Sequence, residues 1–441
     1  MISSKQIFLI EDDYQKKEKI QNLLNADSYQ FLLEHQYLKL NDDKMAFEYV
    51  GVISLGSDLI CVLPKYFKDR GISFDEKKRQ FKAIIKVLKK IGKSEILPDA
   101  KFLKNSKQIF SEIALADRIL KAFVEDGIYE KKQDVNAINS TGEINWDKTI
   151  STMDPIISKN QPIYHETYNF SRVTEDFNII TEIHKWAINY CIKKYSDILD
   201  YSISFTEDHL SFNQLGVLEH LLRVIEKELR ITYLDRDIML LENLRRILTK
   251  ASGEEHKKLN IFGTGYFQTV WEHVCAASFK NKLEQFSSQI PKPFWHNHSG
   301  EGVSKRTLLP DVIALSEDES AFFILDAKYY NFRVSNIPQF TVTGNPGIGD
   351  VSKQLLYEKA MTGVSIGRKY NCFLFPDIFP SFFEINSSVT FDLLDIKEVF
   401  NIQLNAADMF INFIQNNPIG FMNLNGIMIN IETIKKGDGH I

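Results

Sequence analysis

The sequence has few cysteines and no long hydrophobic run. Its four cysteines, Cys61, Cys191, Cys275 and Cys372, are far apart and form no C-x-x-C pair. This spacing predicts buried, reduced thiols in a cytoplasmic protein. No stretch of about 18 or more apolar residues is present, so we predict no membrane span.

Signals for export and for nucleotide binding are also missing. The segment from Met1 to Lys19 becomes charged before any sufficient apolar run, so no signal peptide is predicted. No G-x-x-x-x-G-K-[ST] loop occurs, because GVSIGRKY at 363–370 lacks both the spacing and the hydroxyl. The formal net charge of -5 argues against a uniformly basic surface. It leaves open a local basic groove, or a partner that makes most of the contact with DNA.

The composition is that of soluble globular proteins, with 44% hydrophobic and 25% charged residues. A chain of 441 residues is long enough for two or three domains. The patterns predict an α+β protein with an N-terminal β-rich α/β domain for docking or recognition (1–105), a mostly helical middle region (106–252) and a C-terminal domain (253–441). Ser252-Gly253 and the charged residues after it mark the second boundary.

Alternating and helical patterns define the elements of the first two regions. We predict strands at 5–11, 34–40, 46–54 and 58–67, a helix at 14–26, and a hairpin turn from Asn41 to Lys44. A basic helix at 75–92 places Phe81, Ile84, Ile85 and Leu88 on one face. Its lysines either contact DNA phosphates or form a solvated face. Helices are also predicted at 111–130, 175–195, 213–231 and 236–251, with a turn into a short strand in 138–150. His184 and His220 have no metal-ligand companions at useful spacing.

The most informative stretch runs from Arg306 to Asn331. It contains two apolar strands, LLPDVIAL and AFFILDAKYY, joined by a polar run from Ser316 to Ser320. If Ser316 pairs with Ala321 across a four-residue loop, Asp311 falls opposite Asp326, and Lys328 shares the face of Asp326. A loop one residue longer would require a bulge at Pro310.

Two carboxylates on neighbouring strands suit phosphodiester hydrolysis. This reaction needs a hard cation that polarises the phosphoryl oxygen and lowers the pKa of a bound water, and Mg²⁺ takes carboxylate oxygens while keeping its own waters. Asp311 and Asp326 therefore predict a site for Mg²⁺, with Mn²⁺ as an alternative. Lys328 would orient the attacking water or stabilise charge on the phosphoryl oxygens.

The sequence allows two other interpretations. Asp326 and Lys328 form a structural ion pair in one of them. In the other, the site consists of Asp377, Asp395 and Lys397, but Asp377 follows an apolar strand and Pro380 interrupts the segment after it. We prefer the first pair, because an acid and a lysine at the end of a strand as apolar as AFFILD are costly unless they are used or paired.

The elements around this hairpin suggest further site residues. Before it, Phe267, Val270, Trp271 and Val274 cluster on one helix face, which Glu272 flanks. After it come a loop rich in proline and glycine (337–350), which is suited to closing over substrate, and a helix at 351–363. The segments NCFLFP and VTFDLLDI predict two more strands. His296 and His298 lack the other ligands of a zinc site.

These motifs resemble known nucleases. Pro310-Asp311 with Asp326-Ala327-Lys328 resembles the PD-(D/E)xK nuclease superfamily, while residues 47–67 and FGTGYFQTVWEHV at 262–274 resemble the LlaJI family of restriction endonuclease subunits, which is similar to McrC. The resemblance implies that residues 253–441 form the nuclease domain. It also implies that Glu272 supplies a further acid to the metal, and that Gln354 and Tyr357 face the site. A surface glutamate and ordinary packing are the alternatives for these residues.

The implied activity is cleavage of foreign double-stranded DNA with Mg²⁺ in prokaryotic, antiviral defence. The resemblance implies a separate McrB-like AAA+ GTPase subunit as partner, docked on the N-terminal half, and leaves a homodimer open. The catalytic set would be Asp311, Asp326, Lys328, Glu272 and Gln354, with Asp311, Asp326 and Glu272 as metal ligands. Two other classes stay open: a stand-alone type II sequence-specific endonuclease and a catalytically silent docking protein.

Overall fold

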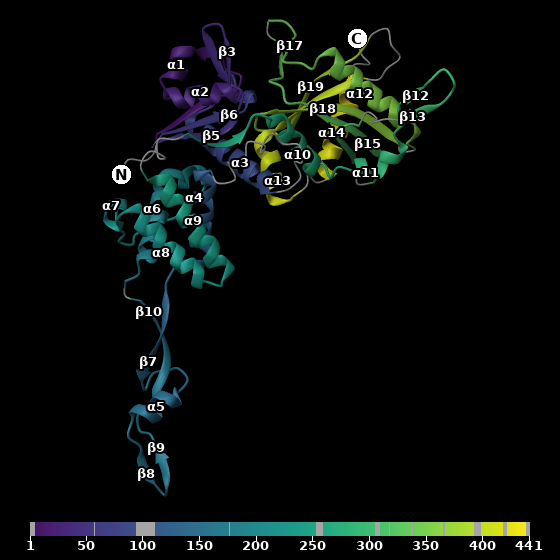
Figure 1. Cartoon of the computed structure of the whole chain (residues 1–441). Helices are drawn as coiled ribbons and strands as arrows, with labels where there is room; N and C mark the ends of the chain where they lie inside the picture. The colour runs from purple at the N-terminus through teal and green to yellow at the C-terminus, as the bar shows by residue number, and fades with distance from the viewer. Residues whose placement is uncertain are drawn as a thin grey trace. The chain divides into compact units, whose positions relative to one another are not determined.

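The chain folds into two compact units that mix helices and sheets, as an α+β protein should (Figure 1). The computed structural model describes residues 5–56, 58–93, 111–175, 177–252, 259–304, 309–316, 318–336, 338–364, 367–391, 398–417 and 421–437. One unit comprises Phe110–Lys258 with Met1–Ser4, and the other comprises Lys5–Ile109 with Leu259–Ile441. The first and last parts of the sequence therefore fold together.

A four-stranded sheet joins these two parts. Its order is β1 (Gln6–Ile10), β6 (Asp58–Leu63), β5 (Val50–Leu55) and β11 (Asn260–Thr264). Gly51 on β5 lies opposite Gly263 on β11. A Cβ on Gly263 would lie 2.2 Å from the Val50 carbonyl oxygen, so only glycine fits there. The two segments that carry the LlaJI resemblance thus contribute adjacent strands.

The other N-terminal elements are helices and the three strands of a separate sheet. They are β2 (Gln15–Lys16), α1 (Lys17–Gln21), α2 (Ala26–Glu34), β3 (Leu38–Asn41), β4 (Lys44–Phe47), η1 (Lys65–Phe67) and α3 (Phe74–Lys93). The predicted hairpin turn is confirmed by the pairing of Asn41 with Lys44. The apolar face predicted for α3 is confirmed as well, since Phe81, Ile84, Ile85 and Leu88 are all buried. The helix predicted at 14–26 is wrong in extent, because its first residues pair with β4 instead.

A five-stranded mixed sheet forms the centre of the C-terminal part. Its order is β14 (Val312–Leu315), β15 (Ala321–Ala327), β18 (Arg368–Asp377), β20 (Val399–Asn405) and β19 (Phe383–Val389). The three inner strands are parallel and the two outer ones antiparallel to their neighbours. The predicted mixed central sheet is therefore confirmed. Of the predicted strand VTFDLLDI, Val389 ends β19, and residues 392–397 lie outside the described part of the chain.

Helices and small hairpins surround this sheet. They are α10 (Phe267–Ser278), α11 (Leu283–Phe286), η3 (Ser287–Gln289), β12 (Phe294–His296), β13 (Gly302–Ser304), β16 (Arg333–Ser335), β17 (Thr341–Thr343), α12 (Ile348–Ala360), η4 (Met361–Gly363), α13 (Ala406–Gln415) and α14 (Phe421–Gly437). Tyr357 and Met361 pack on Phe322 and Ile324, so α12 lies against β15. The strand, strand, helix, strand order expected here is observed as β14, β15, α12 and β18.

The other unit combines helices with a long two-stranded ribbon (Figure 1). The helices are α4 (Glu112–Asp126), α6 (Ile179–Leu199), α7 (Phe212–Leu215), α8 (Leu218–Ile231) and α9 (Asp235–Ala251). The ribbon pairs β7 (Lys132–Ile138) with β10 (Tyr168–Thr174), and between them lie α5 (Trp146–Thr152), β8 (Ile156–Ser158) and β9 (Gln161–Ile163). Of the turn and short strand predicted in 138–150, the structure has an isolated β-bridge between Ile144 and Asn169, after which the Asn145 side chain caps α5.

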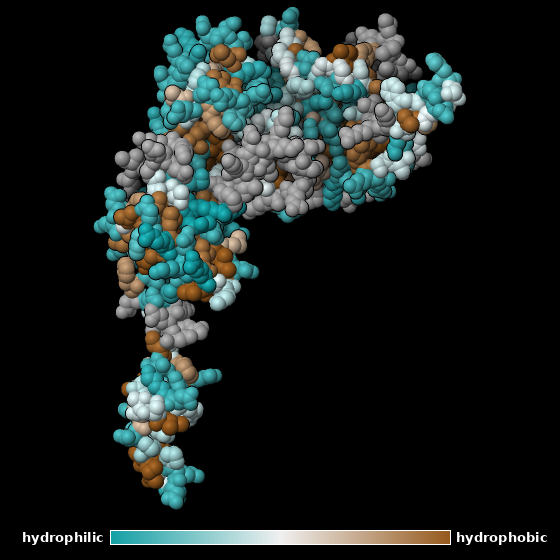
Figure 2. All heavy atoms as spheres, in the orientation of Figure 1, coloured by the Kyte–Doolittle hydropathy of each residue, from teal (hydrophilic) through white to brown (hydrophobic). Residues whose placement is uncertain are grey.

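Hydrophobic side chains are exposed along this ribbon (Figure 2). The exposed residues are Ile138, Ile144, Trp146, Ile150, Ile156, Ile157, Ile163 and Phe170. A series of this kind on a slender element marks an interaction surface. Among the residues with described positions, no helix is long and apolar enough to cross a membrane.

Candidate active site

The hairpin of β14 and β15 has the register that brings the predicted acids together. Ser316 N donates to Ala321 O at 3.0 Å, so the connecting loop has four residues. Val312 pairs with Leu325. Continuing this register by one position places Asp311 opposite Asp326, as the spacing predicted. No bulge at Pro310 is needed.

Asp311 is held at the start of β14 by both its main chain and its side chain. Its Oδ2 accepts a hydrogen bond from Ala327 N at 2.8 Å. The Asn281 amide donates to the Asp311 carbonyl at 2.8 Å and accepts from Ile313 N at 3.0 Å. These contacts fix the Asp311 carboxyl group beside the end of β15.

Lys328 lies between two carboxylates. Its Nζ is 2.7 Å from Asp326 Oδ2 and 2.9 Å from Asp350 Oδ1. The other Asp350 oxygen accepts a hydrogen bond from the Tyr330 hydroxyl at 3.1 Å. The sequence analysis missed Asp350. Asp350 is the last residue of the predicted loop (337–350), directly before the predicted helix, and acids are common near helix N-termini for reasons of the helix dipole.

Three acids at this site have raised pKa values. Burial, followed by the charges of Asp326 and Glu272, raises the pKa of Asp311 to about 7. Burial also raises the pKa of Asp326, although Lys328 opposes the change. The pKa of Glu272 rises because of burial and the nearby Asp326 charge. Acids that affect one another in this way make a centre of crowded negative charge.

Glu272 reaches the site because α10 is anchored beside the end of β15. The neighbouring Trp271 indole donates to the Leu374 carbonyl on β18 at 3.1 Å. The same carbonyl accepts from Lys328 N at 2.9 Å. The apolar face predicted for this helix is confirmed, since Phe267, Val270, Trp271 and Val274 are all buried. The charge of Asp326 contributes to the raised pKa of the adjacent Glu272, which therefore lies near the acids of the hairpin.

Gln354 is fully buried between α12 and the sheet. Its Nε2 donates to Ile324 O on β15 at 3.1 Å and to Cys372 O on β18 at 3.2 Å. Its contacts thus fix α12 against two strands. Tyr357, one turn later, lies near the acids: burial, then the charges of Asp326 and Asp311, raises its pKa to about 12.

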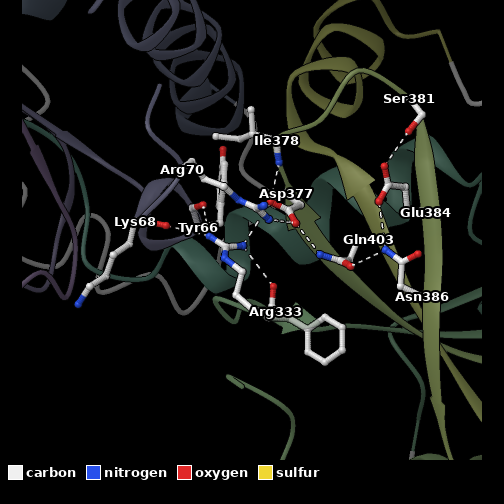
Figure 3. A network of polar contacts seen from close by, with 11 residues as sticks. Tyr66, Lys68, Arg70, Arg333, Asp377, Ile378, Ser381, Glu384, Asn386 and Gln403 are labelled. Carbon is white, nitrogen blue, oxygen red and sulfur yellow. Dashed lines mark hydrogen bonds and ion pairs between the residues drawn. The ribbon is translucent and has the colours of Figure 1, made fainter. Parts of the chain in front are cut away.

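The alternative acid, Asp377, sits in a different environment at the end of β18. Its carboxylate contacts Arg70 and Arg333 and accepts from Gln403 Nε2 and Ile378 N (Figure 3). Arg333 also donates to the Lys68 carbonyl at 2.9 Å. Asp377 therefore joins the residues before and after the middle region. Asp395 and Lys397, its suggested companions, lie outside the described residues.

The histidines are dispersed. His184 is buried, its Nδ1 accepts from Tyr129 N at 3.0 Å, and burial lowers its pKa to about 4. His220, His296 and His298 are exposed. Within the described ranges, no group of three or more His, Cys, Asp or Glu side chains is arranged to hold a metal ion.

The donor set nevertheless fits Mg²⁺. This ion takes one or two carboxylates and completes its shell with water and substrate phosphate. Asp311 and Asp326 supply two carboxylates on facing positions, and burial, together with the charges of neighbouring acids, raises the pKa of both. A divalent cation would relieve this repulsion.

Comparison with known proteins places the chain in a family. The model of the family described as LlaJI restriction endonuclease matches residues 49–407. The type II restriction enzyme BsuMI component YdjA of Bacillus subtilis (strain 168) is 33% identical over 443 residues, covering 97% of this chain and 94% of that protein.

Two solved structures show weak likeness. McrC bound to McrB AAA+ hexamers of Thermococcus gammatolerans has a TM-score of 0.37 and 14% identity, covering 93% of this chain and all of the other. A second structure of the McrBC complex of the same organism has a TM-score of 0.26 and 16% identity, covering 61% and 85%. These values are too low to bear on the partners of this chain. The extended family match and the relative that is similar over almost the whole length make the chain a member of the LlaJI restriction endonuclease family, and so a restriction-system component.

Proposed function

We propose that this chain is the Mg²⁺-dependent DNA endonuclease subunit of a prokaryotic restriction system, with a PD-(D/E)xK site that hydrolyses phosphodiester bonds of double-stranded DNA in the cytoplasm. One observation carries the proposal: the hairpin register sets Asp311 opposite Asp326, with the Lys328 amine 2.7 Å from Asp326. Family membership supplies the substrate class.

Asp311 and Asp326 would hold the cation, with Glu272 as the third acid. When bound, Mg²⁺ would polarise a phosphoryl oxygen and lower the pKa of a coordinated water. Mn²⁺ takes similar oxygen ligands and is the alternative. The raised pKa values of these acids support the assignment, because crowded carboxylates favour a bound cation over isolated protons.

The protein's own groups prepare the site before any ion binds. The bond from Ala327 N to Asp311 orients one carboxyl group. Lys328 brings a positive charge to the place where a phosphate would lie against the acids. Its pKa is raised, because contacts with Asp326 and Asp350 outweigh the effect of burial, so the amine is protonated at neutral pH. A protonated amine stabilises negative charge on a phosphoryl oxygen.

An AAA+ GTPase partner completes the proposal. The sequence has no phosphate-binding loop of its own, so a nucleotide-driven step must come from another subunit. The curated relative is itself called a component of a restriction enzyme. The exposed hydrophobic side chains of the ribbon offer a surface for such a partner.

A plasmid-cleavage assay tests the activity. Purified wild-type protein, Lys328→Ala and the control Lys359→Ala are incubated with Mg²⁺, each with and without the product of a neighbouring AAA+ gene. Lys359 is an exposed lysine on α12, so its loss removes a charge of the same kind away from the acids. We expect cleavage by wild type and Lys359→Ala, and a loss of about 100-fold or more for Lys328→Ala.

The outcomes separate the classes of function. Cleavage that requires the AAA+ protein supports the complete proposal, whereas full activity of the chain alone indicates a stand-alone endonuclease. Cleavage that survives both Lys328→Ala and Asp311→Ala places the active centre elsewhere. A folded wild-type chain that binds the partner but never cuts DNA is a docking protein.

A further inference from the structure

We propose that Asp350 is a positioning residue that holds the Lys328 amine and thereby leaves Asp326 available to the divalent cation. The inference rests on the proposed function, since it presumes that Asp326 is a metal ligand. Asp350 is not among the residues that the sequence pattern assigned to the site.

The contacts of Asp350 are suited to this role. One carboxylate oxygen accepts from Lys328 at 2.9 Å and the other from the Tyr330 hydroxyl at 3.1 Å. Each oxygen therefore has its own donor, and both donors come from the segment that follows β15. An ammonium group has three N–H donors, so Lys328 can bind Asp326 and Asp350 at the same time.

The placement of Asp350 is fixed by the helix that carries it. Asp350 and Gln354 are four residues apart on α12, so they lie on the same helix face. Gln354 is tied to the main chain of β15 and β18. Asp350 consequently keeps its position relative to the end of β15 when the ion at the acids changes.

The Lys328 ammonium and a divalent cation would compete for Asp326, and Asp350 affects the outcome. A cation that binds Asp326 must displace or repel the ammonium that lies 2.7 Å away. Asp350 gives the ammonium a second carboxylate to which it stays bound. Without Asp350, Lys328 would depend on Asp326 alone, and the cation would have to break the amine's remaining ion pair. Asp350 should therefore strengthen cation binding through Lys328.

A double-mutant cycle on metal affinity tests this mechanism without measuring cleavage. Mn²⁺ binding to the metal-free protein, in the absence of DNA, is followed by titration calorimetry and by the loss of the free-ion electron paramagnetic resonance signal. The proteins are wild type, Asp350→Asn, Lys328→Met and the double variant. Asp350→Asn should weaken Mn²⁺ binding by about tenfold, the size of coupling found between contacting residues.

The same substitution should have little effect once the amine is gone. In the Lys328→Met background, Asp350→Asn should change the affinity by less than about twofold, because Asp350 then has no ammonium group to hold and the coupling between the two residues is lost. Tyr330→Phe provides a second variant, which loosens Asp350 without removing its charge. It should weaken binding in the wild-type background and leave Lys328→Met unchanged.

Equal losses in both backgrounds would overturn the proposal, because Asp350 would then act only through its own negative charge. Unchanged affinity of Asp350→Asn would overturn it as well. A different result would show that the proposed function is wrong. Wild-type Mn²⁺ binding would then be absent, or Asp311→Asn would not remove it, or Asp318→Asn would remove it as well. Asp318 is the matched acid on the loop of the same hairpin. Thermal unfolding in EDTA confirms that each variant is folded.

Discussion

Replacing Asp311 with asparagine should make the metal-free protein more stable at alkaline pH. Burial, followed by the charges of Asp326 and Glu272, raises the pKa of this carboxyl group from its ordinary 3.8 to about 7. One pKa unit corresponds to about 1.4 kcal/mol, so the charged form costs at most about 4 kcal/mol. We expect about 2 kcal/mol, since Asp326 shares the titration. Asparagine keeps an oxygen that can accept from Ala327 N.

The sign of the pH dependence follows from proton binding. Between about pH 4 and pH 7 the folded wild type holds a proton that the unfolded chain has released, so its free energy of unfolding falls as pH rises. The gain in Asp311→Asn should therefore be absent near pH 4 and complete by about pH 8. Mg²⁺ should stabilise the wild type at pH 8 and leave the variant unchanged.

Urea unfolding in EDTA at several pH values measures this difference. Asp318→Asn is the control with the opposite sign. The Asp318 carboxylate accepts hydrogen bonds from Ser316 and from Ser320, and these lower the pKa of Asp318 to about 2. The charged form of Asp318 therefore stabilises the hairpin. If Asp311→Asn proves less stable than wild type at pH 8, the carboxylate is not crowded, and the reasoning about the metal site fails.

Two further predictions concern buried ion pairs. Asp377→Asn should lower the free energy of unfolding by about 3 kcal/mol, the lower end for a broken buried pair, because Arg70 and Arg333 are partly exposed. Urea unfolding measures it, and lost cleavage at unchanged stability would instead restore Asp377 as a catalytic candidate. Glu112→Gln should cost about 3 kcal/mol, because it removes a carboxylate 2.8 Å from the buried Lys194 amine. Its loss should appear in unfolding curves and leave Mn²⁺ affinity unchanged, whereas a weakened affinity would contradict a local effect.

The sequence was sufficient to predict the hairpin because its geometry is local. A strand places side chains alternately, so the number of residues between Ser316 and Ala321 decides which residues face each other. The buried face of α3 and that of α10 follow from helical periodicity in the same way. In each case the sequence pattern and the element that it predicts span fewer than about 25 residues. Over that length, the period at which apolar side chains recur determines which of them are buried.

Contacts between distant segments had no such signal. Asp350 approaches Lys328 only because α12 packs on β15, and Arg70 approaches Asp377 only because the first and last parts of the chain share one unit. The β7–β10 ribbon was missed because its two strands are separated in the sequence by α5, β8 and β9, so no short hairpin turn links them.

Two neighbouring strand ends carry acids in different surroundings, which bears on which of these acids could bind a metal ion. Asp377, at the end of β18, is neutralised by two arginines and held by Gln403. Asp326, by contrast, is paired with one amine, Lys328, which also binds Asp350, and the neutral side chains of Trp271, Gln354 and Asn281 bind main-chain groups nearby.

Anchors of this kind fix the strands and helices without neutralising the acids. Neutral amide and indole groups do not titrate at physiological pH, and a hydrogen bond to a main-chain carbonyl leaves the nearby carboxylates to other partners. The fold therefore holds its acids close together at a cost in stability, which a divalent cation would offset. Two arginines contact Asp377, whereas Asp326 shares the Lys328 amine with Asp350 and lies opposite Asp311, so the hairpin leaves more negative charge for a metal ion to offset.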